Sequence, residues 1–329
     1  MQLRDGLRTG AGIAVSPGLW GGKEMRLLIL GAGATGGYFG GRLAEAGRDV
    51  TFLVRPGRAE QLARDGLVVT SPHGDIRRPV STVTGDALAP DYDAVILTCK
   101  AYDLDDALAA IAPGVGPETR IVPLLNGMRH LDRLDAAFGP GRVLGGLCAI
   151  AATLTADGSV KHLNKFHLLT FGERDGTRTP FCEALGKDLT AAGFDARFST
   201  IILQEMWEKW VMLATLGAMT CLMRAGVGAI LEAAEGEALI LETLDECSRI
   251  ATAAGYPPRD KHLERTRAML TERGSGLAAS MLRDIEGGGR IEADHVIGDL
   301  LGRARAHGVD APLLRVAFCH LQTYEAGRC

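Results

Sequence analysis

The spacing of apolar residues divides the chain into two parts. From Met25 to about residue 197, short apolar runs alternate with amphipathic stretches. This pattern predicts strands at 26–30, 49–54, 94–98, 120–125 and 142–148. It predicts a first helix that follows a glycine-rich turn and ends near 47, and further helices at about 57–64, 103–111 and 129–137. Such alternation indicates βαβ units and a parallel sheet. A more strand-like stretch follows, and its Asp157-Gly158 pair predicts a hairpin turn between strands 149–155 and 160–171.

After Phe198 the two-residue period disappears and a helical period replaces it. Helices are predicted at 201–223, 228–254, 259–272, 276–286, 292–307 and 312–325, with Gly and Pro residues between them. The fold class is therefore α/β followed by an all-α part. We expect a nucleotide-binding domain over 25–197 and a helical substrate and catalytic domain over 198–329. Residues 1–24 have no hydrophobic period, so we expect a disordered extension or a misassigned start upstream of Met25.

Composition narrows the class of protein. Of the 329 residues, 47% are hydrophobic and 23% are charged, which is typical of a globular protein. A net charge of −4 argues against a nucleic-acid partner. The longest uncharged helical run, 210–223, is too short for a membrane span and indicates a buried helix. Seven scattered cysteines without metal-ligand spacing favour reduced thiols in the cytoplasm and no bound metal.

A glycine-rich turn follows the first predicted strand. It has the pattern G-x-G-x-x-G and comprises Gly31, Ala32, Gly33, Ala34, Thr35 and Gly36. With a strand before it and a helix after it, this turn predicts a Rossmann-type dinucleotide site, because glycine lets backbone N–H groups approach a pyrophosphate. A glycine-rich turn without a ligand is the alternative.

The end of the second strand indicates which dinucleotide binds. An NAD enzyme would place an acid there, whereas this chain has Arg55, and Arg58 soon after it. A guanidinium can bind the 2′-phosphate that a carboxylate would repel. The sequence therefore favours NADPH, with Arg55 as the main contact and Arg58 as a second; a solvated loop arginine is the alternative.

Two further strand ends carry polar side chains. Lys100 follows the strand at 94–98, and Asn126 follows the strand at 120–125. Ligands of open α/β sheets bind outside the carboxyl ends of the strands, so both side chains are candidates to face cofactor or substrate. Either residue could instead begin a helix, and asparagine is a favourable N-cap.

In this order and spacing the motifs resemble the ketopantoate reductase (2-dehydropantoate 2-reductase) family over nearly all of residues 25–329. The resemblance rests on GAGATGG at 31–37, Arg55, Lys100 in TCKAYD, Asn126 in NGM, Trp207-Glu208-Lys209, Ser280-Met281 with Asp284, Glu292 with Asp294, and RARAHGVDAP at 303–312. It implies a Rossmann-type domain followed by an all-α domain, as in 6-phosphogluconate-dehydrogenase-like folds. The sequence leaves the oligomeric state open, with a homodimer as one alternative.

Members of that family reduce a 2-keto acid with NADPH and use a lysine as general acid. The resemblance implies that Lys209 is this lysine, that Lys100 and Asn126 lie at the nicotinamide end, and that Glu292 lies by the cofactor ribose and Lys209. It also implies that Ser280 and Asn126 contact the substrate together with Lys209. Independently, Lys209 is the last charge before the uncharged run, where we expect an exposed helix to become buried. The alternative is a surface ion pair with Glu205.

This chain departs from the family pattern in the predicted substrate pocket. The family has asparagines four and eight residues after the lysine, where this chain has Leu213 and Gly217; a third family asparagine aligns less certainly with Val227. Lost hydrogen bonds of this kind cost about 0.5–1.5 kcal/mol each. A bulkier or less polar 2-keto acid would suit such a pocket.

Three functions therefore compete. The first is NADPH-dependent reduction of 2-dehydropantoate to D-pantoate, or of a related 2-keto acid. The second is oxidation of a hydroxy acid, which Arg55 argues against because cellular NADPH favours reduction. The third is a non-catalytic NADPH-binding sensor, which the lost asparagines permit but the retained Lys209, Ser280 and Glu292 oppose.

Overall fold

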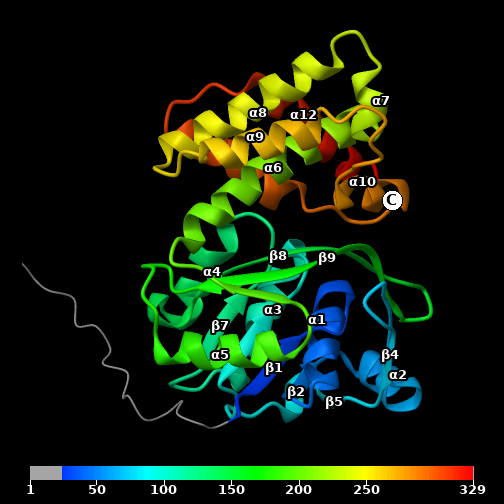
Figure 1. Ribbon diagram of the computed structural model, residues 1–329, viewed down its shortest axis with the longest axis vertical. Coiled ribbons are helices and arrows are strands. Elements are labelled where there is room, and N and C mark those ends of the chain that lie inside the picture. The colour runs from blue at the N-terminus through cyan, green and yellow to red at the C-terminus, as the bar shows by residue number, and fades with distance from the viewer. Residues whose placement is uncertain (1–23, 329) are drawn as a thin grey trace, which may run out of the picture.

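A five-stranded parallel sheet lies at the centre of the N-terminal half (Figure 1). The computed structural model describes residues 24–328, so the expectation for residues 1–24 falls outside the described residues except for Glu24. The strand order is β5-β2-β1-β6-β7. The strands are β1 (Arg26–Leu30), β2 (Asp49–Leu53), β5 (Ser81–Val83), β6 (Ala94–Leu97) and β7 (Arg120–Pro123). Because every pair is parallel, the carboxyl ends of all five strands meet at one edge.

A second, mixed sheet lies beside the first, with the strand order β10-β9-β3-β4 and β8 paired to β9. Its strands are β3 (Leu67–Thr70), β4 (Ile76–Arg78), β8 (Gly145–Leu154), β9 (Val160–Gly172) and β10 (Asp195–Phe198). The predicted hairpin turn at Asp157-Gly158 is confirmed, since β8 and β9 pair antiparallel around it. The division into strands 142–148 and 149–155 was wrong: a 3₁₀ turn occupies Pro140–Arg142, and one continuous strand follows.

Helix α1 (Ala34–Glu45) lies between the two sheets, and its glycines make this possible. A Cβ added at Gly40 would lie 2.6 Å from Phe52 of the first sheet, and one at Gly37 would lie 2.8 Å from Val160 of the second. The other helices of this half are α2 (Pro56–Asp65), α3 (Leu104–Ile111), α4 (Arg129–Phe138) and α5 (Pro180–Ala191). Short 3₁₀ turns are η1 (Gly85–Ala87), η2 (Ala101–Asp103), η3 (Ala112–Gly114) and η4 (Pro140–Arg142).

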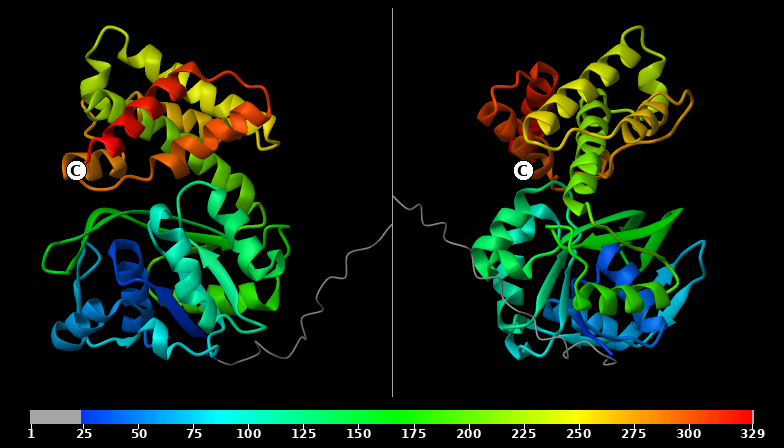
Figure 2. Two further views of the ribbon diagram at one scale, coloured as in Figure 1. Left: turned by 180° about the vertical axis from the view of Figure 1, so that it is seen from behind. Right: turned by 60° about the vertical axis from the view of Figure 1, so that its left-hand side comes forward.

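From Ile202 onward the described chain is helical, which confirms the predicted fold class (Figures 1 and 2). The helices are α6 (Ile202–Met223), α7 (Val227–Leu231), α8 (Gly236–Ala253), α9 (Asp260–Leu270), α10 (Ser280–Glu286), α11 (Asp299–Ala306) and α12 (Pro312–Ala326), and a π-helical turn, η5, spans Asp294–Gly298.

Three of the predicted helices differ from the structure. The span 228–254 is two helices, because the chain folds back so closely at Gly236 that a Cβ there would overlap the carbonyl of Ile230. Residues 276–279 form a non-helical segment before α10. The span 292–307 contains the π-helical turn ahead of α11, so its first part is not α-helical.

Helix α6 connects the two halves. Ile202 and Met206 pack against Gly145 of β8, where a Cβ would lie 2.7 Å from Ile202. One hydrophobic core therefore runs from the face of the parallel sheet that carries Val95 and Ile121 into the helical half. Within residues 24–328, every helix is too short or too polar to span a bilayer.

Candidate active site

The glycine-rich turn is shaped by contacts that exclude larger side chains. Gly31 has a φ of +88° and donates its N–H to the carbonyl of Leu53 at 2.9 Å, which ties the turn to β2. A Cβ at Gly36 would overlap the carbonyl of Gly31 and the hydroxyl of Thr98. Gly33 is the N-cap of α1, and no side chain caps the N–H groups of its first turn. An uncapped helix N-terminus of this kind favours an anion such as a pyrophosphate.

A cavity of about 1730 Å³ begins at this turn and extends into the helical half. Both halves of the chain contribute to its wall. Of the residues singled out in the sequence, those that line the cavity include Gly31, Ala32, Gly33, Ala34, Thr35, Arg55, Arg58, Lys100, Asn126, Glu205, Glu208, Lys209, Leu213, Ser280 and Glu292. Gly36 is buried behind the turn and does not line the cavity.

The two arginines after β2 have different surroundings. Arg58 donates to the carbonyl of Ala32 at 2.8 Å and to Gln61 at 2.7 Å, and burial lowers its pKa. Arg55 is exposed, and its side chain makes no hydrogen bond or ion pair with any residue between 24 and 328. Arg58 therefore supports the glycine-rich turn, while the guanidinium of Arg55 remains free for a ligand.

Sequence reasoning missed an acid in the same region. Asp86 lines the cavity from the 3₁₀ turn after β5, the strand that pairs with β2. A hydrogen bond with the Thr84 side chain lowers the pKa of Asp86, so the group is a carboxylate at neutral pH. The position of Asp86 beside the end of β2 could have been predicted only if the short strand β5 had been recognised in the sequence.

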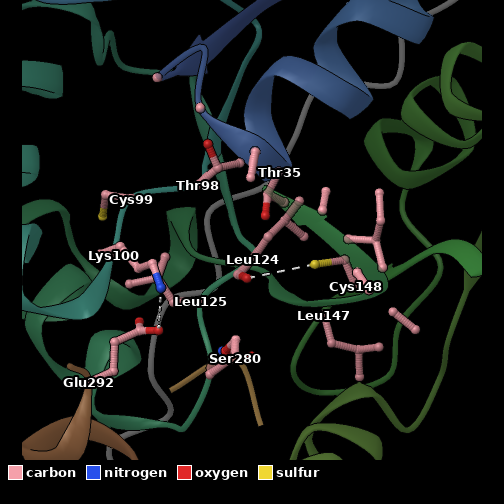
Figure 3. Close-up of a pocket in the computed structure, with 18 of the residues that line it drawn as sticks. Thr35, Thr98, Cys99, Lys100, Leu124, Leu125, Leu147, Cys148, Ser280 and Glu292 are labelled. Carbon is pink, nitrogen blue, oxygen red and sulfur yellow. Dashed lines mark hydrogen bonds and ion pairs between the residues drawn. The ribbon is translucent and has the colours of Figure 1, made fainter. Parts of the chain in front are cut away.

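Lys100 joins the halves at the middle of the cavity. Its Nζ lies 2.9 Å from Asp284 of α10 and 3.5 Å from Glu292, and Figure 3 shows the contact with Glu292. Glu292 is buried and also accepts the backbone N–H of Ala101 at 3.0 Å. Burial acts against the charge of Lys100, but the two carboxylates outweigh it and raise its pKa.

Lys209 lies at the boundary between the halves. Its Nζ donates to Oδ1 of Asn126 at 3.1 Å, across 83 residues of sequence. The alternative pairing with Glu205 is not found, because Glu205 bonds Arg197 at 2.7 Å. The Asn126 side chain is not the N-cap of α4, a position that Met128 occupies.

The expected change from exposed to buried helix at Lys209 was wrong. Trp207 and Glu208 are already buried, because α6 enters the protein at Ile202. Burial acts to raise the pKa of Glu208, but hydrogen bonds from Arg259 at 2.7 and 2.6 Å outweigh it and lower the pKa. Both neighbouring acids therefore have other partners, and the ammonium of Lys209 remains bound to an amide.

The positions of the missing asparagines differ from each other. Leu213 lies one turn after Lys209 and lines the cavity. Gly217 is buried and does not line it, and a Cβ at Gly217 would lie 3.1 Å from Cε of Met281. Gly217 therefore contributes no surface to the cavity, and the expectation of a bulkier or less polar 2-keto acid rests on Leu213. Val227 is buried at the start of α7, outside the cavity wall.

Ser280 is the first residue of α10 and is exposed toward the cavity (Figure 3). No group of three or more His, Cys, Asp or Glu residues within 24–328 has the arrangement of a metal site. The described cysteines are free thiols.

Comparison with known proteins identifies the family. The family model "Ketopantoate reductase PanE/ApbA" matches residues 27–176, and its C-terminal counterpart matches residues 201–325. The chain belongs to the ketopantoate reductase family. Members named as oxidoreductases cover almost the whole chain, and this family member is itself an oxidoreductase.

Two relatives illustrate the range of similarity. An uncharacterized oxidoreductase, YkpB, from Bacillus subtilis is 35% identical and covers 92% of this chain and 99% of its own length. A 2-dehydropantoate 2-reductase from Halobacterium salinarum is 28% identical and covers 88% of this chain and 96% of its own.

Solved structures share the fold of this ketopantoate reductase family member. A 2-dehydropantoate 2-reductase from Geobacter metallireducens has a TM-score of 0.82 at 27% identity, covering 91% of this chain and 99% of its own. A D-mandelate dehydrogenase, solved with NADH and anilino(oxo)acetate, has a TM-score of 0.82 at 20% identity and covers 92% and 98% of the two chains.

Proposed function

We propose that this protein reduces 2-dehydropantoate, or a closely related 2-keto acid, with NADPH, and that Lys209 is the general acid. The observation that carries the proposal is the position of Lys209, which lines the same cavity as the glycine-rich turn and whose ammonium binds an amide oxygen and no carboxylate among residues 24–328. The name of the Halobacterium salinarum relative supports the reaction. Under this proposal residues 25–197 hold the cofactor and residues 198–329 supply the acid.

The residues of the N-terminal half fit NADPH. The close approach at Gly36 and the uncapped start of α1 leave backbone N–H groups free for a pyrophosphate. Arg55, whose side chain has no partner among the described residues, supplies a cation for a 2′-phosphate, although the carboxylate of Asp86 also lines the cavity. When bound, the cofactor supplies a hydride to the 2-keto carbon. Lys100, Asn126 and Glu292 line the deeper part of the cavity, where we place the nicotinamide and its ribose.

Lys209 then has one chemical task. As the keto oxygen gains negative charge, the ammonium donates its proton and the product is a 2-hydroxy acid. A positioned proton donor of this kind contributes about 10²- to 10⁴-fold to a rate. Asn126 holds the ammonium without neutralising it, because an amide oxygen accepts a hydrogen bond but carries no net charge. We place the substrate between Lys209, Asn126 and Ser280.

A second candidate is reduction of a more apolar 2-keto acid, and the wall of the cavity favours it. Next to Lys209, α6 presents Met212, Leu213 and Leu216 to the cavity, and Leu277 and Ala278 precede Ser280. The family's asparagine amides are absent at Leu213, which lines the cavity, and at Gly217, which does not. The D-mandelate dehydrogenase of similar fold holds an anilino(oxo)acetate, a 2-oxo compound with an aromatic ring, which supports such a substrate.

The test is NADPH oxidation by the purified protein, followed by absorbance. The panel comprises 2-dehydropantoate, 2-ketoisovalerate, 4-methyl-2-oxopentanoate and phenylglyoxylate. The highest kcat/KM for 2-dehydropantoate supports the first candidate, and the highest value for an apolar member supports the second. Tight NADPH binding without turnover of any member would contradict the proposed reaction and favour a sensor.

We also propose that the protein is a homodimer. A ketopantoate reductase from Staphylococcus aureus that is described as dimeric shares the fold, with a TM-score of 0.76 at 20% identity and coverage of 93% and 100% of the two chains. Sedimentation equilibrium at micromolar concentration gives twice the chain mass if this is right. A single-chain mass across the range would contradict it.

A further inference from the structure

The π-helical turn at Asp294–Gly298 contacts the helix that carries Lys209. π-turns are rare and often lie at functional sites, and their change of register disturbs the hydrogen bonds of nearby helical carbonyls. The carbonyl of Val296, within the turn, accepts a hydrogen bond of 2.8 Å from Nε1 of Trp210. Trp210 is buried and directly follows Lys209 on α6. The turn is therefore bound to the backbone position next to the proton donor.

The same turn also contacts the loop that carries Asn126. The ring and the carbonyl of His295 lie directly against Gly127, the residue after Asn126. Gly127 makes the approach possible: its φ is +76°, and a Cβ there would lie 3.0 Å from the carbonyl of His295 and 3.1 Å from its ring. The turn thus binds the loop after β7 as well as α6.

These contacts close a ring of interactions. Asn126 accepts from Lys209 at 3.1 Å, Trp210 donates to Val296, and His295 packs against Gly127, the residue after Asn126. The covalent chain completes the ring, because Lys209 and Trp210 are neighbours in sequence and so are His295 and Val296. Lys209 is therefore fixed by its own hydrogen bond to Asn126 and by the hydrogen bond of Trp210, the next residue on α6. The π-helical turn contacts both Trp210 and the loop that carries Asn126.

The imidazoles behind the ring carry no charge at neutral pH. Nδ1 of His130 lies 3.4 Å from Nε2 of His295, and both side chains are buried. Burial lowers the pKa of His130, and it lowers that of His295 to about 4. The charged groups that act on this pair are Asp299, Arg129 and Lys209. Neutral imidazoles add no positive charge beside the ammonium of Lys209.

We propose that the π-helical turn is a positioning element for the proton donor, in which Val296 and His295 set the place of Lys209 through Trp210 and Asn126. The inference rests on the proposed function and adds residues that do not touch the substrate. Its physical basis is that a misplacement of about 1 Å at a reacting group can cost about 10²-fold in rate.

The first experiment compares two tryptophans on α6. Trp210→Phe removes the indole donor and keeps most of the ring, whereas Trp207→Phe makes a similar loss of buried area. The Trp207 indole donates no hydrogen bond within residues 24–328. We expect Trp210→Phe to lower kcat about tenfold, with KM and the Kd for NADPH little changed, and Trp207→Phe to leave kcat within about twofold of wild type. Equal effects of the two variants would overturn the proposal.

The second experiment replaces His295. We expect His295→Phe to lower kcat as Trp210→Phe does, because the larger ring disturbs the close contact with Gly127. His295→Asn or His295→Gln should recover part of the loss, since these side chains are smaller than phenylalanine. Circular dichroism and thermal unfolding identify variants that fail to fold. A folded His295→Phe variant with wild-type kcat would contradict the role of this residue.

A third measurement separates this inference from the proposed function. In the protein without cofactor, a small amine-reactive reagent modifies Lys209 at a rate that peptide mass spectrometry measures, with Lys261 on the same cavity as internal reference. If no 2-keto acid is turned over, the proposed function fails. The modification rate still tests whether the π-helical turn positions Lys209, because it does not depend on turnover. Faster modification of Lys209 relative to Lys261 in Trp210→Phe supports the ring, and an unchanged ratio overturns it.

Discussion

The two ends of the cavity are built in different ways. The pyrophosphate end is formed mainly by the backbone of one continuous segment, Gly31–Thr35, which runs from the end of β1 into the first turn of α1. The Lys209 end consists of side chains from segments far apart in the sequence, such as Asn126 and Lys209. Local backbone geometry leaves a motif in the sequence, whereas an assembly of distant side chains leaves separate, individually ambiguous residues. The variants below test whether the two ends are as independent as this difference implies.

The largest effect is expected at the Lys209 end. Lys209→Ala removes the proposed acid and should lower kcat by about 10²- to 10⁴-fold. Its Kd for NADPH should stay within about twofold, because the glycine-rich turn and Arg55 are untouched. Steady-state kinetics and fluorescence titration of NADPH measure the two quantities. The control is Lys261→Ala, another lysine of the cavity wall; a loss of less than tenfold for Lys209→Ala would contradict the acid role.

At the nucleotide end, Arg55→Ala should weaken NADPH but not NADH. A hydrogen bond to a charged group contributes about 1.5–3 kcal/mol, which corresponds to roughly 10- to 100-fold in Kd. Titrations with both cofactors measure the change. Arg64→Ala is the matched control, since Arg64 lies on α2 and pairs with Asp65. Equal losses for NADPH and NADH would contradict the assignment of Arg55 to the 2′-phosphate.

Substitutions at two glycines of the turn distinguish its effect on the stability of the protein from its effect on cofactor binding. Gly36→Ala should destabilise the cofactor-free protein by about 1–3 kcal/mol, because a Cβ overlaps the Gly31 carbonyl. Gly33→Ala should leave that stability nearly unchanged, since nothing lies within 4 Å of its Cβ position and its φ is −86°. We expect both variants to bind NADPH more weakly. Urea unfolding and NADPH titration measure these effects; equal destabilisation by both changes would contradict the description of the turn.

The smallest effect is expected at Leu213. Leu213→Asn restores an amide one turn after Lys209 and should raise kcat/KM for 2-dehydropantoate relative to an apolar 2-keto acid by a few-fold. The reason is that one neutral hydrogen bond contributes about 0.5–1.5 kcal/mol. Leu213→Met is the control for a change of shape alone. An equal shift of preference with Leu213→Met would show that polarity at this position does not govern the choice.

The same contrast explains what the sequence could predict. The strand, turn and helix around Gly31 follow from local chemistry, and so does the position of Arg55 after β2. Asn126 remained ambiguous between cap and ligand, because only the contact with Lys209 across the halves distinguishes them. Asp86 and His295 were missed because a strand of three residues and a π-helical turn depend on tertiary contacts, which leave no periodic pattern.

The contact between Gly217 and Met281 has a consequence for redesign of this pocket. A Cβ at 217 would lie 3.1 Å from Cε of Met281, the terminal methyl of a flexible side chain. A larger residue at 217 therefore requires Met281 to shift by a few tenths of an ångström. Substitutions at 217 and 281 should have non-additive effects on stability, because the two residues are in contact. An asparagine at 217 is best introduced together with a smaller residue at 281.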